Sequence, residues 1–160
     1  MALKWKKNDL MTLAEKKVQM ANETCQSLIY AGIDVQLTTG QEHFSLEPND
    51  QTNIDSMFTA VTLGATQYPY HSDGAQCKMY SAVDIVTLYV AYKTFVTKQT
   101  TYCNFLKIWV NRETDKDVLA GITYGSELPS DLNAEMEEIL TAAAAEIQAI
   151  IGKMQQTMEA

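Results

Sequence analysis

The stretch from Ser81 to Arg112 has an apolar pattern that predicts one long helix. Ser81 and Asp84 form a capping box at its start, and apolar or neutral side chains then recur in alternating steps of four and three residues. A second apolar row at a spacing of seven makes the face broad enough for several neighbours. At about 1.5 Å per residue the helix is roughly 45 Å long, so the other segments are expected to pack against it. The first row is Ile85, Tyr89, Tyr92, Val96, Gln99, Cys103, Leu106 and Val110, and the second is Leu88, Phe95, Tyr102 and Trp109.

Another helix is predicted near the N-terminus. Thr12 and Glu15 form a capping box that opens it, and Gly32 fits a C-terminal cap. Its apolar row is Ala14, Val18, Ala21, Cys25 and Leu28. Residues 1–9 are mostly polar and are expected to form a flexible arm. Trp5 stands among lysines in this arm and could anchor it on a partner.

After Gly32 the apolar period changes to two. Apolar and polar residues alternate on both sides of the Thr39-Gly40 turn, which predicts a β-hairpin over residues 32–47. The alternating apolar positions are Ile33, Val35, Leu37, Phe44 and Leu46. Pro48 then starts a helix, with Asn49 or Asp50 as its cap. Its predicted inward positions are Ile54, Met57, Phe58, Val61 and Leu63.

A second hairpin and a last helix complete the prediction. Asp73-Gly74 is a strong turn signal between two short strands within residues 71–80, which follow a loop at Tyr68-Pro69-Tyr70. After Arg112 an irregular, polar connection leads to Ser130, a plausible cap for the last helix. The apolar row of that helix keeps a four-three rhythm almost to the end and comprises Met136, Leu140, Ala143, Ile147, Ile150 and Met154.

The predicted fold is α+β and mostly helical, with a long central helix, two short β-hairpins and a C-terminal coiled-coil-like helix. We divide the chain into a flexible arm (1–9), a helix/hairpin domain (10–128) and an oligomerisation helix (129–160). The last helix reaches roughly 45 Å, whereas a compact 160-residue domain has a radius of gyration of only about 15 Å. The domain is therefore expected to cover only its first half. The far end is expected to contact another chain through Ile147, Ile150, Ile151 and Met154.

Charge and cysteine usage narrow the choice of partners. The net charge is −8, and an acidic body argues against nucleic acid, because binding to phosphates needs clustered Lys and Arg. No run of eighteen apolar residues exists, so no membrane insertion is expected. The three cysteines are an odd count without close pairing, which predicts reduced thiols and synthesis in a cytoplasm.

Candidate chemistry is sparse, and we expect no enzyme and no cofactor. The chain has no Ser-centred elbow, no phosphate-binding glycine loop and no HExxH or CxxC pair. His71 and Cys77 on the second hairpin, with Cys103 on the long helix, are candidate zinc ligands, but their spacing is loose and also fits a packed Cys and a hydrogen-bonded His. Tyr68 and Tyr70 belong to a tyrosine-rich region that is typical either of a carbohydrate or peptide surface or of half-buried packing layers.

Four short motifs, in their order along the chain, resemble those of a known family. They are DQ-x-N-I from Asp50 to Ile54, HxDG from His71 to Gly74, TTYCN from Thr100 to Asn104 and ITYGSELP from Ile122 to Pro129. Over roughly residues 14–140 the chain resembles small proteins from the tail-gene clusters of long-tailed phages and prophages of Firmicutes. Those proteins are related in pattern to a phage domain of unknown function at the ends of tail-fibre proteins. The resemblance implies a virion tail or baseplate component, or a factor used in assembling one, made in the bacterial cytoplasm, and it implies no catalytic residues.

Three functions follow from these observations as hypotheses. The first is a non-enzymatic tail or tail-fibre-associated structural protein that binds itself and other tail proteins. The second is an assembly factor that binds the tail fibre and then leaves. The third is a small receptor- or glycan-binding module that uses the tyrosine-rich hairpin.

Overall fold

The computed structural model describes residues 7–159. In chain order the elements are α1 (Lys7–Ala31), β1 (Ile33–Leu37), β2 (Gly40–Phe44), α2 (Pro48–Thr62), β3 (Gln67–Tyr70), β4 (Lys78–Ser81), α3 (Ala82–Arg112), α4 (Lys116–Gly121) and α5 (Ser130–Glu159). The strands form two separate antiparallel hairpins, β1-β2 and β3-β4. This arrangement confirms the predicted mostly helical α+β fold with a long central helix and two short hairpins.

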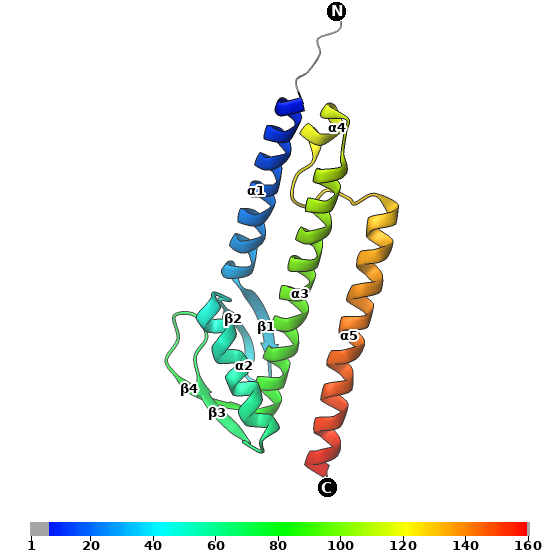
Figure 1. The fold of residues 1–160 in the computed structure, drawn as a ribbon. Coiled ribbons are helices and arrows are strands. Elements are labelled where there is room, and N and C mark those ends of the chain that lie inside the picture. The colour runs from blue at the N-terminus through cyan, green and yellow to red at the C-terminus, as the bar shows by residue number, and fades with distance from the viewer. Residues whose placement is uncertain (1–6, 160) are drawn as a thin grey trace, which may run out of the picture.

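Helix α3 is the element against which the others pack. The Ser81 hydroxyl accepts a hydrogen bond from the Asp84 amide at 3.2 Å, so Ser81 caps the helix as predicted. Helices α1 and α5 lie on opposite sides of α3, both antiparallel to it, while α2 and the two hairpins gather at its N-terminal end (Figure 1). The three long helices therefore form a layer that extends well beyond the hairpins.

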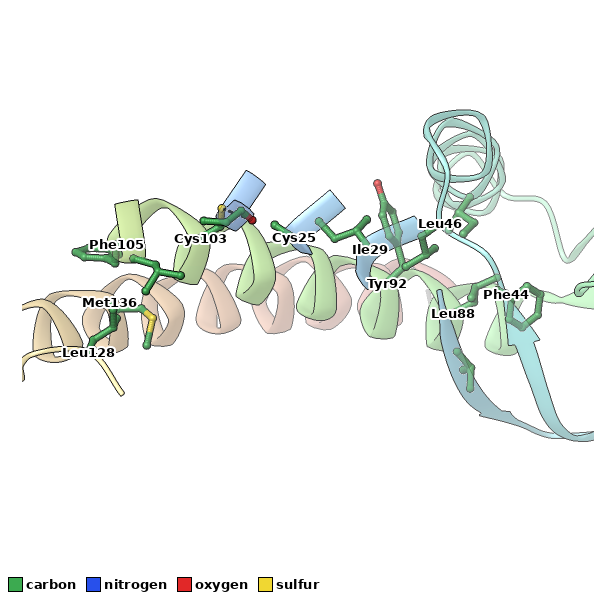
Figure 2. Packing of buried hydrophobic residues seen from close by; sticks show 14 of the residues in the cluster. Cys25, Ile29, Phe44, Leu46, Leu88, Tyr92, Cys103, Phe105, Leu128 and Met136 are labelled. Carbon is green, nitrogen blue, oxygen red and sulfur yellow. Dashed lines mark hydrogen bonds between the residues drawn. The ribbon is translucent and has the colours of Figure 1, made fainter. Parts of the chain in front are cut away.

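The hydrophobic core is a strip that follows α3 from end to end. Near its start, Leu88 and Tyr92 pack with Leu46 from the segment after the first hairpin (Figure 2). In the middle the strip continues into the seam between α1 and α3, and at the far end it is closed by Phe105 and Met136 (Figure 2). Both predicted rows of α3 face this strip, because every apolar member of them is buried in it or packs against it.

The N-terminal helix begins earlier than the sequence pattern predicts. Helix α1 starts at Lys7 rather than at Thr12, so residues 7–9, which we assigned to the arm, are helical. The sequence from residue 7 to residue 11 contains neither glycine nor proline, so nothing in it opposes a helix. A capping-box pattern inside a favourable stretch does not have to start a helix. The rest of the predicted arm, with Trp5, lies outside the described residues.

The first hairpin is confirmed, with Ile33 opposite Phe44 and Leu37 opposite Gly40. The second differs from its prediction, because β3 is the Gln67–Tyr70 segment that we expected to be a loop. Pro69 lies opposite Met79 in this two-stranded sheet, and proline is tolerated there because an edge strand has amides that need no partner. Residues 71–77 form the connection, which is longer than a tight Asp73-Gly74 turn.

Helix α2 also starts and ends differently from the prediction. Its cap is Glu47, with Pro48 as the first helical residue, rather than Asn49 or Asp50. Leu63 does not point inward, because it follows the helix end and is 85% exposed. The buried positions 54, 57, 58 and 61 keep helical spacing, whereas a residue two positions after Val61 lies on the opposite face of a helix.

Helix α5 is covered by its own chain further than we predicted. It runs antiparallel beside α3 along its length (Figure 1), and Ile151 and Met154 approach Val83 and Val86 near the start of α3. The expectation that the domain could cover only the first half is wrong, because α3 extends as far as α5 does. Within residues 7–159, no helix combines the length and apolarity that a membrane span requires.

Candidate functional site

Two of the predicted interaction residues of α5, Ile150 and Met154, line a groove at the hairpin end of the molecule. Ile147, Ile151 and Met154 are half-buried, whereas Ile150 remains 40% exposed. The groove has a volume of about 710 Å³ and separates the end of α5 from the end of α2 and the start of α3. Its lining is Val61, Thr62, Gly64, Ala65, Thr66, Ser81, Ala82, Val83, Ile150, Lys153 and Met154. Most of this lining is apolar, and Lys153 is the one charged residue among the described side chains that line it.

The rim of the groove carries the most exposed large apolar side chain among the described residues, Leu63. A hydrogen-bonded turn fixes its position: the Gly64 amide donates to the Val61 carbonyl and the Ala65 amide to the Ala60 carbonyl, both at 3.0 Å. This pair of bonds is a Schellman motif, in which Gly64 adopts φ +105°, a conformation that favours glycine. Leu63 is therefore held outward by the helix end.

The apolar pattern predicted an inward position for Leu63, although the sequence also contains a signal against it. Gly64 directly follows the last helical positions, and a glycine there predicts a C-terminal cap. A helix that ends at this glycine cap leaves Leu63 outside the helix. Val83, also on the groove, is 61% exposed, so the apolar surface extends from the end of α2 to the first turn of α3.

The two predicted interaction tyrosines have different environments. Tyr70 is half-buried, and its ring stacks on Phe44 with centroids 6.2 Å apart. Burial, together with the charges of Asp50 and Asp73, raises the pKa of Tyr70 to about 12. Tyr68, by contrast, is 40% exposed. Tyr70 thus serves packing between the hairpins, and only Tyr68 presents a ring to solvent.

The three candidate metal ligands are not brought together. His71 and Cys77 are exposed in the β3-β4 connection, whereas Cys103 is buried in the seam between α1 and α3 (Figure 2). The Cys103 Sγ lies 3.5 Å from the Ala21 carbonyl oxygen, and burial raises the pKa of this thiol to about 11. In residues 7–159 no group of three or more His, Cys, Asp or Glu side chains is arranged to hold a metal ion.

A polar junction that the sequence did not predict joins the two hairpins. Asp73 accepts hydrogen bonds from the Ser45 amide, at 3.0 Å, and from the Ser45 hydroxyl. Burial alone would raise the pKa of Asp73, but these bonds outweigh it and lower the pKa. Nearby, Glu42 is bound by Lys78 at 2.6 Å and by the Tyr80 hydroxyl at 2.7 Å. These bonds likewise overcome burial and bring the pKa of Glu42 down to about 2.

His43 in this junction contacts acceptors with both ring nitrogens. Its Nδ1 lies 2.7 Å from an Asp34 carboxylate oxygen and its Nε2 lies 2.8 Å from the Ala31 carbonyl oxygen. The hydrogen bond to Asp34 and the bond to Ala31 raise the pKa of His43, because two acceptors favour the imidazolium form. An imidazole held this way donates protons to structural partners and offers no lone pair for base catalysis. We interpret the junction as structural.

A third polar contact fixes the first hairpin to α3. Asp84, which is buried, accepts from the Thr38 amide at 2.8 Å and from the Thr38 hydroxyl at 2.7 Å. The Ser81 hydroxyl also donates to it at 3.0 Å. Burial would raise the pKa of Asp84, but the bonds from Thr38 and Ser81 lower it. The start of α3, which forms one wall of the groove, is thereby held rigidly.

Comparison with known proteins yields one family. A family model described as Domain of unknown function (DUF4376) matches residues 12–123. The matched region runs from α1 to the end of α4 and stops before α5. No curated protein and no solved structure matches the chain.

Proposed function

The chain belongs to the family described as Domain of unknown function (DUF4376), and we propose that it is a non-enzymatic structural protein of a phage tail or baseplate. In this proposal it acts through protein–protein contacts, is made in the bacterial cytoplasm and remains in the virion tail. The resemblance of its motifs to proteins of phage tail-gene clusters supports the phage assignment. The observation that carries the binding role is the exposed apolar groove with Leu63 on its rim.

Apolar patches of this kind mark interaction sites. Single exposed apolar residues are normal on protein surfaces, but adjoining ones around a concave apolar lining indicate a binding surface. Leu63, Val83 and Ile150 adjoin or line the groove and are all exposed. The polar clusters, by contrast, are occupied by contacts within the chain, as the bonds of His43 and Glu42 illustrate.

The chain exposes more surface than a compact monomer of the same mass. The chain exposes 10055 Å², whereas a compact monomer of 17.9 kDa exposes roughly 8,000 Å². Even if the seven residues outside the described part were fully exposed, they would account for roughly 1,200 Å². The remaining excess of roughly 800 Å² reflects the elongated layer of three long helices (Figure 1), which leaves more surface available to partners than a compact domain has.

Quantitative mass spectrometry of purified particles from a phage that encodes this protein tests the proposal. A structural component is expected at a stoichiometric ratio to the other tail proteins. Absence from mature particles, combined with co-purification with the tail fibre before assembly, would replace the proposal with the assembly-factor hypothesis. Binding of the isolated protein to a glycan array, lost on Tyr68→Ala, would favour the receptor-binding hypothesis instead.

A variant pair links this test to the groove. Val83→Glu places a charge on the groove lining and is expected to lower incorporation into particles. Val118→Glu is the matched control, because Val118 on α4 is 43% exposed and lies away from the groove lining. Equal incorporation of both variants would show that the groove is not the contact surface.

A further inference from the structure

We propose that the partner at this groove is a second copy of the chain, and that Leu63 of each copy enters the groove of the other. This inference rests on the proposed function in taking the groove as a protein contact surface, and it adds the identity of the partner. Two features carry it: a rigid apolar projection and an apolar hollow of suitable size, both at the same end of the molecule.

The projection is preorganised for insertion. Leu63 is 85% exposed, and the Schellman bonds of Gly64 and Ala65 fix the backbone on its C-terminal side. Little backbone freedom is therefore lost when the side chain is buried against a partner, which favours association. Burying this leucine in an apolar contact would be favourable.

The hollow lies directly beside the projection. Thr62 and Gly64, the neighbours of Leu63 in the chain, both line the groove. Its volume of about 710 Å³ lies within the range of sites that enclose whole small ligands, so it can take a leucine together with the flanking turn. Among the described side chains, those that line the groove include no carboxylate that burial would leave unpaired.

A projection next to a hollow makes a surface complementary to itself. When two copies are related by a two-fold axis, each can insert Leu63 into the groove of the other, so that one contact is formed twice. Such a contact closes at the dimer and leaves neither Leu63 exposed for open-ended aggregation.

The chain's own N-terminal segment does not fit this groove. Helix α1 begins at the end of the molecule opposite the groove (Figure 1). Residues 1–6 reach at most about 22 Å when fully extended, whereas the 31-residue α3, which spans the distance between the two ends, is about 46 Å long. A segment from another copy could reach, and the experiment includes it as an alternative.

Sedimentation velocity of the full chain over a low to high micromolar range tests the inference. The wild-type protein is expected to show a concentration-dependent monomer–dimer equilibrium. Leu63→Glu and Val83→Glu are expected to raise the dimer dissociation constant at least tenfold. Both sites are exposed, and an acidic residue in the first turn of α3 suits the helix dipole, so folding should be retained and circular dichroism checks it.

Matched controls separate this contact from general surface effects. Ile108→Glu and Val118→Glu alter side chains that are 41% and 43% exposed and lie outside the groove lining, and each is expected to change the dissociation constant less than twofold. A wild-type chain that stays monomeric throughout, or a dimer unaffected by Leu63→Glu, overturns the inference. A dimer lost on deletion of residues 1–6 also overturns it, in favour of the N-terminal segment of another copy as the occupant.

The particle experiment keeps the two proposals distinguishable. If the chain is monomeric in solution yet stoichiometric in particles, the inference fails and the proposed function stands. If it dimerises through Leu63 but is absent from both particles and tail-fibre complexes, the proposed function fails and the self-association stands.

Discussion

Asp84 is the residue whose replacement should reveal how strongly the first hairpin is attached to the central helix. In Asp84→Asn the side chain loses its charge, and its amide nitrogen cannot accept from the Thr38 amide or hydroxyl. Hydrogen bonds to a charged acceptor contribute about 1.5–3 kcal/mol each, but burial of the carboxylate offsets part of this. With one of the two Thr38 donors left unpaired and the cap weakened, we expect a loss of about 3 kcal/mol in the free energy of unfolding.

Urea unfolding followed by circular dichroism measures this loss. For a chain of this size about 3 kcal/mol corresponds to a fall in Tm of roughly 6–12 °C. The matched control is Glu137→Gln on the exposed side of α5, which removes the same charge and should change stability by less than about 0.5 kcal/mol. A loss from Asp84→Asn as small as that of the control would refute the reasoning.

The pH dependence provides an independent check. Because the folded-state pKa of Asp84 is lowered, its contribution is fully present above the unfolded value near 3.9 and disappears as the pH falls through the folded value. The difference in stability between wild type and Asp84→Asn should therefore be constant above about pH 5 and shrink below about pH 4. A difference that stays constant under acidic conditions would mean that the carboxylate charge is not what Thr38 recognises.

Three further predictions concern other parts of the fold. Leu106 is fully buried, so Leu106→Ala should lower the free energy of unfolding by about 2–5 kcal/mol in a urea titration. Leu106→Met should lower it by less than about 1.5 kcal/mol. In the folded protein only Cys77 should react quickly with a thiol reagent, because Cys25 and Cys103 are buried; rapid labelling of all three, measured by intact mass, would contradict the packing of α1 on α3. Glu42→Gln should be less stable than wild type at neutral pH, because the pKa of Glu42 is lowered to about 2 in the folded state. The difference in the free energy of unfolding should vanish as the pH falls from about 4.5 to about 2.

The parts of the fold that sequence could predict are those encoded in local periodicity. The long helix from Ser81 carries its cap and its apolar rows within one segment, and the first hairpin carries its own alternation and turn. The second hairpin was placed wrongly because Asp73-Gly74 is a strong local turn signal. In the structure Asp73 instead contacts Ser45, 28 residues away, and a local pattern does not contain such a partner.

The candidate site shows the same division. The apolar row of α5 singled out Ile150 and Met154 as interaction residues, because helical spacing is visible in sequence, and both line the groove. Leu63 was misplaced, since the end of α2 depends on whether Gly64 adopts a left-handed conformation. The groove forms where the ends of α2 and α5 lie near the start of α3. This placement is a result of tertiary packing. No spacing within one segment predicts that.

The arrangement of α5 has a consequence for how the molecule opens. Among the described elements α5 makes substantial contacts with α3 alone, whereas α3 also holds α1, α2 and the hairpins. Detaching α5 therefore breaks one seam and leaves the remaining core assembled, so α5 is expected to behave as a separate cooperative unit with a low opening free energy. Its amides should exchange with solvent through this partial opening, at rates that depend little on denaturant. The amides of α3 should exchange only when the whole chain unfolds.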